Sequence, residues 1–235
     1  MEQIVAGQNE ANIIQPVDAA QAACWVVVIS GTSGSGKTTL VRKTAELLGD
    51  AVCLYFDDYR SVSVYPQPDL TAWLAAGADP DEWRTPRFAA DLGLLRIGQT
   101  ISLPDGKGIV EAKPYIVVED PFGRSRQEMA PSIDFVAYID LPLEVAMARK
   151  LRREINGIAR DRGLEAALDR LNGFFAEFLD GPVREAYIAA NRIARSTCDL
   201  VLDGMRPIEE LAEEIVQRVR ALSSGTVAGN RGVRG

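Results

Sequence analysis

The most informative segment of the chain is Gly31-Thr32-Ser33-Gly34-Ser35-Gly36-Lys37-Thr38-Thr39. It follows an apolar, β-branched run at residues 25–29 and precedes a helical pattern at residues 40–48. A strand, a glycine-rich loop and a helix in this order form the context in which G-x-x-x-x-G-K-[ST] builds a phosphate-binding loop. The sequence therefore predicts a site for a nucleoside triphosphate.

The residue types of this loop suit a large, highly charged ligand. Glycine at positions 31, 34 and 36 lets successive backbone N–H groups point inward at phosphate oxygens, because no side chain blocks the path. Lys37 can reach the β- and γ-phosphates as a catalytic cation, and the Thr38 hydroxyl can bind Mg²⁺. We expect the residues that bind ATP to be Gly31, Thr32, Ser33, Gly34, Ser35, Gly36, Lys37, Thr38 and Thr39.

Composition and charge exclude several classes of function. The chain has 235 residues, of which 47% are hydrophobic and 25% charged, as is typical of a globular protein. The net charge is −7, whereas nucleic-acid-binding proteins are usually basic overall, so we expect no nucleic-acid partner. The chain contains no histidine, which excludes a histidine base, a Ser-His-Asp triad and a His-ligated metal site.

The cysteines and the apolar runs indicate where the protein resides. Cys24, Cys53 and Cys198 lie far apart, in or beside apolar runs, and form no CxxC pair, which predicts buried free thiols of a reducing compartment. No run approaches the roughly 20 apolar residues of a membrane span. Residues 1–22 contain no Lys or Arg, so the basic region of a signal peptide is missing. We expect a cytoplasmic protein with no membrane partner.

Five apolar runs alternate with helical patterns along the chain. This alternation predicts an α/β fold, namely a three-layer α/β/α sandwich with a mostly parallel central sheet and a helical lid. We expect an N-terminal arm over residues 1–22, one domain over residues 23–222 and a disordered tail over residues 223–235. The runs expected to form strands are residues 25–29, 51–56, 115–120, 135–140 and 199–204.

Acidic residues follow two of these strands. Ligands of open α/β sheets gather at the carboxyl ends of the strands, where Asp57 and Asp58 are expected. A carboxylate there can take the proton of an acceptor hydroxyl, which is the preferred interpretation, and an acidic turn or a helix cap is the alternative. Glu119 and Asp120 can support Mg²⁺ beside a triphosphate, or they form an acidic loop edge.

A strongly basic segment over residues 149–163 predicts a lid. A basic helix followed by a glycine-containing loop around Gly157 and Gly163 would close over the phosphates, exclude water and neutralise charge. A solvated charged face is the alternative, and a nucleic-acid patch is disfavoured because no aromatic residues interleave. After the lid, apolar residues at helical spacing from Leu164 to Phe178 predict a packed helix. The basic residues of the lid are Arg149, Lys150, Arg152, Arg153, Arg160 and Arg162.

The acceptor region is expected within residues 60–115. Prolines predict loop and helix in its first part, and Asp105-Gly106 predicts the turn of a β-hairpin over residues 100–111. Trp73 and Trp83 can stack on an acceptor ring, but core packing is the preferred interpretation.

The order of these features resembles the uridine kinase/phosphoribulokinase-type branch of P-loop small-molecule kinases, which also holds nicotinamide riboside and pantothenate kinases. The resemblance spans residues 24–222. It rests on the phosphate loop, Asp57-Asp58-Tyr59, the strand end Val117-Val118-Glu119, the R-x-x-R-R-E and R-D elements of the lid, and Asp199-Leu200-Val201-Leu202-Asp203-Gly204.

The resemblance implies roles for individual residues. Asp57 matches the proposed base, Glu119 the glutamate that supports Mg²⁺, and Arg153 and Arg160 the lid arginines that approach the triphosphate as catalytic residues. Asp120 stands where the branch has glycine, and Lys113-Pro114-Tyr115-Ile116 does not match its P-x-Y-D acceptor element. The histidine usual in uridine kinases is absent as well. These departures argue against uridine as the acceptor.

Three functions follow from these observations. The leading one is an ATP-dependent kinase acting on a hydroxyl of a small nucleoside-like, vitamin-like or sugar-like acceptor. The arginines Arg124 and Arg126 keep open a nucleoside-monophosphate kinase, whose acceptor is already anionic. A regulatory nucleotide-binding module is the third reading, because Asp105-x-x-Gly108 matches a short GTPase pattern, although no N-K-x-D motif occurs. A homodimer is compatible with the sequence.

Overall fold

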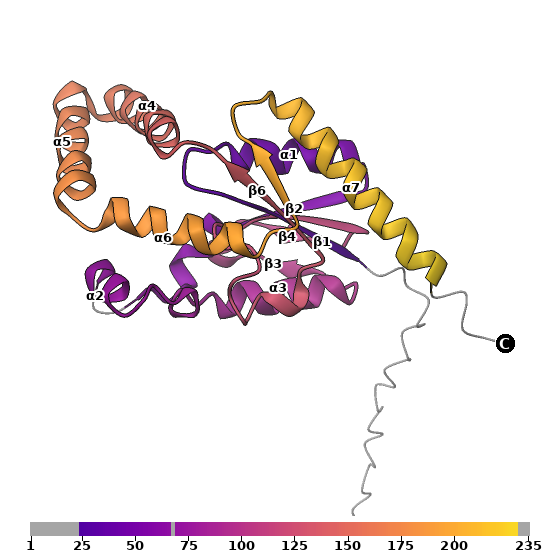
Figure 1. Ribbon diagram of the computed structural model, residues 1–235. Helices are drawn as coiled ribbons and strands as arrows, with labels where there is room; N and C mark the ends of the chain where they lie inside the picture. Colours follow the sequence, from indigo (N-terminus) through magenta and orange to yellow (C-terminus); the bar gives the residue numbers. More distant parts are fainter. Residues whose placement is uncertain (1–23, 67–68, 230–235) are drawn as a thin grey trace, which may run out of the picture.

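The computed structural model describes residues 24–66 and 69–229 (Figure 1). The arm predicted over residues 1–22 lies outside the described residues. Five parallel strands form the central sheet in the order β2-β5-β1-β6-β7. The strands are β1 (Trp25–Ser30), β2 (Ala51–Tyr55), β5 (Tyr115–Glu119), β6 (Phe135–Asp140) and β7 (Leu200–Asp203). The α/β prediction is confirmed, and β1 occupies the centre of the sheet.

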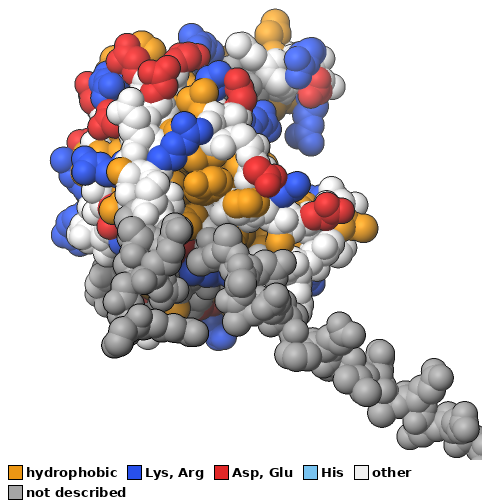
Figure 2. Space-filling view, turned by 90° about the vertical axis from the view of Figure 1, so that its right-hand side faces the viewer, with side chains coloured by type: hydrophobic (Ala, Val, Ile, Leu, Met, Phe, Trp, Pro, Cys, Tyr) orange, Lys and Arg blue, Asp and Glu red, His pale blue; other side chains and the backbone are white. Residues whose placement is uncertain are grey.

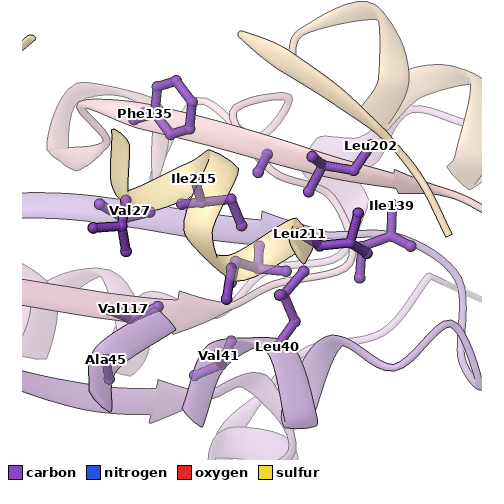
Figure 3. Packing of buried hydrophobic residues seen from close by; sticks show 14 of the residues in the cluster. Val27, Leu40, Val41, Ala45, Val117, Phe135, Ile139, Leu202, Leu211 and Ile215 are labelled. Carbon is purple, nitrogen blue, oxygen red and sulfur yellow. The ribbon is translucent and has the colours of Figure 1, made fainter. Parts of the chain in front are cut away.

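Helices cover both faces of this sheet (Figure 1). α1 (Lys37–Leu48) and α7 (Ile208–Gly229) lie on one face, and α3 (Pro86–Arg96) lies on the other. Successive side chains of a strand point to opposite faces of its sheet. The apolar residues of β1 therefore contribute to two cores, one on each face. Val27 packs towards α1 and α7 (Figure 3), and Ile29 belongs to the same core, whereas Val26 and Val28 pack towards α3.

The remaining elements lie around the carboxyl ends of the strands. α4 (Leu143–Arg162), α5 (Leu164–Phe175) and α6 (Val183–Ser196) form an arch that extends away from the sheet (Figure 1). α2 (Leu70–Ala75) packs against α6 through a small apolar cluster that includes Trp73 and Ala189. The predicted hairpin is confirmed as β3 (Ile101–Ser102) paired with β4 (Ile109–Val110), with Asp105 in the turn.

Two predictions about the helices are wrong. Gly157 lies inside α4, which runs unbroken to Arg162, so the basic segment contains no glycine loop before Gly163. α7 continues to Gly229, past the predicted start of the disordered tail, and residues 230–235 lie outside the described residues. Neither glycine nor small polar residues stop a helix whose preceding turns are anchored by packing.

The helix predicted to be packed after Leu164 is only partly so. Phe174 is buried, but Leu164 and Leu168 are 76% and 59% exposed. Helical spacing shows that these residues share a face, whereas it does not say whether another element covers that face. The arch of α4, α5 and α6 leaves this face of α5 open.

The cysteines are free thiols, as predicted, but their burial differs. Cys24 is buried, and burial raises its pKa to about 11, whereas Cys53 and Cys198 are half-buried. Among residues 24–66 and 69–229, no helix combines the length and the apolar character that a membrane crossing requires.

Candidate active site

The phosphate loop connects the central strand β1 to α1. Gly36 is the N-cap of α1 with a φ of +100°, and Gly34 has a φ of +86°, values that favour glycine. A Cβ atom at Gly34 would overlap the backbone carbonyl of Ala146, because α4 packs directly on the loop. The loop therefore opens its backbone N–H groups at the N-terminus of α1, the arrangement that suits phosphate oxygens.

Lys37 is held at the centre of the loop with little access to water. It is 7% exposed, its Nζ atom donates to the Thr32 carbonyl at 3.0 Å, and it lies 3.7 Å from a carboxylate oxygen of Glu119. Burial lowers the pKa of Lys37, while the nearby charges of Glu119, Asp57 and Asp120 oppose that effect. Phosphates entering the loop would add negative charge beside this ammonium group and favour its charged form.

Thr38 and Glu119 form an oxygen-rich pair beside Lys37. The Thr38 hydroxyl donates to the Glu119 carboxylate at 2.6 Å, so the two predicted metal ligands lie together. Hydroxyl and carboxylate oxygens are the donors that Mg²⁺ prefers, and Mg²⁺ beside a nucleotide usually keeps several waters. The residues present thus fit a magnesium ion completed by phosphates and water. Among the described residues, no group of three His, Cys, Asp or Glu forms a self-sufficient metal cage.

Two hydroxyls of the loop are also consistent with an incoming polar ligand. The Thr32 and Ser35 hydroxyl oxygens are buried and have no hydrogen-bond partner within the described part of the chain. Buried polar groups are rarely left unsatisfied, because each costs about 1–3 kcal/mol.

Asp57 and Asp58, predicted as a functional pair, have different surroundings. Both lie in the 3₁₀ turn Phe56–Val62 that follows β2. Asp58 forms an ion pair with Lys107 at 3.1 Å, whereas Asp57 is exposed and lines the same pocket as Lys37 and Glu119. Of the two acids, Asp57 is therefore the one available to a ligand.

Asp120, considered with Glu119 as a metal-side acid, points elsewhere. It is fully buried and forms an ion pair with Arg126, whose guanidinium also donates to the Trp83 carbonyl and the Thr85 hydroxyl. Successive residues at a strand end point to opposite sides, so Glu119 reaches the phosphate loop and Asp120 does not. The prediction that both acids serve the metal is corrected for Asp120.

Arg124 and Arg126, considered for an anionic acceptor, are both committed to internal contacts. Arg126 is fully buried with Asp120, and Arg124 donates to Asp199 at 2.8 Å and to the Asp134 carbonyl. Neither arginine lines the pocket beside the loop.

One cavity of about 400 Å³ joins the loop to the inner side of the arch. Lys37, Asp57 and Glu119 form its polar end. The other end is largely apolar, with aromatic side chains from four segments. The residues of that end are Phe56, Leu70, Trp73, Trp83, Phe122, Val183, Ala186 and Ala190, with Asn191 as a polar member, whereas Tyr187 lines the cavity beside Ser33 of the phosphate loop. Trp73 is 1% exposed and packs edge-on against Trp83, as the packing interpretation predicts, while both also line the cavity.

Sequence reasoning missed the residues that α5 and α6 supply to the cavity. Arg170, Phe174 and Glu177 line it from α5 and the turn that follows, beside Lys150 of α4, which is among the predicted basic residues of the lid. Val183, Ala186, Tyr187 and Ala190 recur at helical spacing, a signal that identifies the apolar face of α6. Arg170 is a charged residue within the apolar helical pattern from Leu164 to Phe178, and this charge is the sequence signal that could have identified it as a cavity residue.

The lid arginines predicted from the resemblance do not line the cavity. Arg153 and Arg160 are exposed, and Arg160 pairs with its neighbour Asp161. Arg153 and Arg160 are seven residues apart, so they lie on the same face of α4. Ala146, which contacts the phosphate loop, lies on this face nearer the start of the helix. In their place, Lys150 and Arg170 present their charges to the cavity.

The comparisons with known proteins agree with this geometry. No family model matches the chain. The chain is 30% identical over 157 residues to the uridine kinase of Borrelia duttonii, covering 62% of this chain and 73% of that protein. It is 22% identical over 186 residues to the uridine kinase of Pectobacterium carotovorum, covering 72% and 87%.

A solved structure shares the fold. The crystal structure of a proposed fructose transport system kinase from Silicibacter sp. TM1040 superposes with a TM-score of 0.50 at 17% identity, covering 79% of this chain and 93% of that one. Together with the phosphate loop at the centre of the parallel sheet, the 30% identity over most of a curated relative establishes that this chain belongs to the uridine kinase family and is a P-loop kinase.

Proposed function

We propose that the protein transfers the γ-phosphoryl group of Mg-ATP to a hydroxyl group of a small molecule, with Asp57 as the base. The observation that carries this proposal is the shared pocket of Asp57 and Lys37. An exposed carboxylate without an ion pair among the described residues faces the cavity whose other wall is the phosphate loop. A hydroxyl bound between them would meet both a proton acceptor and the phosphate to be transferred.

The residues of the site divide the work of phosphoryl transfer. The backbone N–H groups of Gly31–Thr39 and the Lys37 ammonium bind and orient the phosphates. Thr38 and Glu119 hold Mg²⁺ and its waters, and the ion supplies neutralisation of phosphate charge. The oxygen of the acceptor hydroxyl attacks the γ-phosphorus while Asp57 accepts the proton of that hydroxyl. The proton ends on the Asp57 carboxyl group, the bond to the β-phosphate breaks, and ADP leaves.

Arg153 and Arg160 belong to this proposal as lid residues that approach the phosphates on closure. Their spacing keeps both on one face of α4, the face that touches the phosphate loop at Ala146. Closure of the α4–α5 hairpin would bring this face over the nucleotide and exclude water.

A neutral acceptor fits the cavity better than a nucleoside monophosphate. The acceptor end is walled by Phe56, Trp83 and Phe122, which suit the flat or apolar part of a nucleoside-like, vitamin-like or sugar-like compound. A monophosphate needs free arginines, and Arg124 and Arg126 are held by internal carboxylates. The missing histidine and the unmatched P-x-Y-D element argue against uridine, although the relatives carry the name uridine kinase.

We also propose that the acceptor is a free small molecule of the cytoplasm and not part of a nucleic acid. Figure 2 shows basic and acidic side chains intermingled on the visible face, with hydrophobic side chains between them. Nucleic-acid binding calls for a continuous basic surface, which this face lacks. The free thiols Cys24, Cys53 and Cys198 suit a reducing compartment.

The direct test of the Asp57 role is Asp57→Asn. We expect kcat for acceptor phosphorylation to fall by about 10²- to 10⁴-fold, because the amide cannot take the proton. Affinity for a non-hydrolysable ATP analogue should not fall, since Asp57 is no part of the loop and the substitution removes a negative charge near Lys37. Asp58→Asn is the matched control, because Asp58 is occupied by Lys107. Near-normal turnover of Asp57→Asn would remove Asp57 from the base role.

A further inference from the structure

Three charged side chains of the α4–α5 hairpin form a cluster at the edge of the cavity. A carboxylate oxygen of Glu154 lies 2.6 Å from Lys150 Nζ, and the other lies 3.1 Å from Arg170 Nη2. Both cations also lie over the ring of Phe174, at 5.2 and 6.0 Å from its centroid. One carboxylate and one aromatic ring thus hold two cations in place.

This cluster lies beside the phosphate loop. The Cβ atom of Lys150 is 3.2 Å from the position that a Cβ would take on Gly34. Lys150 and Arg170 line the cavity together with Thr32 and Lys37, whereas Glu154 does not line it. Both cationic residues therefore contribute to the wall of the space that the phosphates would enter, whereas Glu154 does not.

The charges of the cluster do not balance. One carboxylate serves two cations, so the cluster carries a net positive charge of one at neutral pH. Burial works against ionisation of Glu154, but hydrogen bonds and attraction from Lys150 and Arg170 outweigh it and lower its pKa. The Lys150 side chain is only 12% exposed, so water screens its charge weakly. Phosphate oxygens would complete the neutralisation of both cations.

We propose that Lys150 and Arg170 bind the phosphate chain of the nucleotide, and that Glu154 is a placeholder anion that positions them and competes with the phosphates. The inference rests on the proposed triphosphate site of the loop and adds a second cationic wall to it. Before the nucleotide binds, Glu154 keeps both side chains aimed across the cavity. When the nucleotide binds, phosphate oxygens take over hydrogen bonds that Glu154 accepts in the free protein.

If Glu154 competes with the phosphates, its substitution should raise the affinity for the nucleotide, whereas substitution of Lys150 or Arg170 should lower it. Glu154→Gln keeps the size and an accepting oxygen but removes the competing charge. An ATP analogue should bind about two- to fivefold more tightly, which corresponds to the worth of a partly exposed ion pair. Lys150→Met and Arg170→Met should each weaken binding by about 10- to 100-fold, the worth of a charge-assisted hydrogen bond. Lys150→Arg should retain most of the affinity.

The experiment is calorimetric titration of the full chain with a non-hydrolysable ATP analogue at fixed ionic strength. Arg152→Met is the control for charge loss on α4, since Arg152 lines a separate groove with Glu144 and Arg149 and faces away from the cavity. Its affinity should stay within about twofold of wild type.

Opposite signs for Glu154→Gln and Lys150→Met, with Arg152→Met unchanged, would support the inference. Weaker binding in Glu154→Gln as well would overturn it, because the cluster would then be a structural ion pair. Equal losses in Lys150→Met and Arg152→Met would also overturn it. Absence of analogue binding by the wild-type chain would instead contradict the proposed function, so the two failures are distinguishable.

Discussion

Individual side chains at the strand ends decide what the site can do. Lys37, Asp57 and Glu119 could be predicted, because each follows a strand whose end is recognisable in the sequence and whose neighbours meet at one edge of the sheet. The internal use of Asp120 and Arg126 could not, because their pairing joins a strand end to a loop through tertiary packing. A charged residue in a sequence shows that a charge exists, and only its surroundings show which partner it has.

The Asp120–Arg126 pair makes a prediction about stability. Arg126→Met should lower the free energy of unfolding by about 3–5 kcal/mol, because it leaves the Asp120 carboxylate buried without a counter-ion, held only by backbone N–H groups such as that of Phe122. Urea unfolding followed by circular dichroism measures the change. The double variant Asp120→Asn with Arg126→Met should recover part of the loss, since no buried charge then remains unpaired.

A surface arginine provides the matched control for that experiment. Arg206 pairs with Glu210 and Glu214, all of them exposed, so Arg206→Met should cost less than about 1 kcal/mol. Similar losses for Arg126→Met and Arg206→Met would show that the buried pair contributes no more than a surface contact.

Among the elements, α4 joins a contact with the phosphate loop to the basic segment for which the sequence predicts a lid. Its first turns pack on the phosphate loop at Gly34, and its later turns carry the basic residues of the hairpin with α5. Its basic residues predict a lid, which stays a prediction. The continuous course of α4 through Gly157 could not be predicted, because a single glycine lowers helix propensity by only about 1 kcal/mol and packing outweighs it.

Alanine substitution should be harmful at Gly34, which contacts α4, and stabilising at Gly157, which lies within α4. Gly34→Ala should strongly reduce ATP-analogue affinity, because its φ of +86° disfavours alanine and the added Cβ overlaps the Ala146 carbonyl. Gly157→Ala should raise stability by about 0.5–1 kcal/mol, since it lies within a helix and its added Cβ meets open space. Thermal unfolding and analogue titration measure both effects.

The same pair of variants tests whether Gly157 is a hinge. If kcat is unchanged in Gly157→Ala, α4 moves as one rigid element. A loss of kcat with unchanged stability would mean that Gly157 must bend during turnover, contrary to the continuous helix seen here.

At the scale of the whole molecule, the central sheet was the most predictable part. All five of its strands are short β-branched or apolar runs that alternate with helices, and such patterns are local. The acceptor end of the cavity was the least predictable part. It is assembled from α2, α6 and three connecting segments that are distant in sequence, and each contributes apolar residues that look like ordinary core.

The phosphate-donor side of the site is easier to predict from sequence than the proposed acceptor side. The donor half is built by one contiguous loop with backbone N–H groups, so a short motif specifies it. The proposed acceptor half depends on which side chains meet across the cavity, and Phe56, Trp83 and Phe122 come from three separate segments. A family assignment therefore fixes the donor chemistry before it fixes the acceptor.

The most direct measurement of the central claim is phosphoryl transfer from γ-labelled ATP by the wild-type chain and Asp57→Asn. Neutral hydroxyl compounds (nucleosides, vitamins and sugars) would be compared with nucleoside monophosphates, and the products analysed for a phosphate monoester. We predict labelled monoester from at least one neutral compound, none from the monophosphates, and a loss of about 10²-fold or more in Asp57→Asn. Transfer to monophosphates alone, or equal transfer by both proteins, would contradict the account.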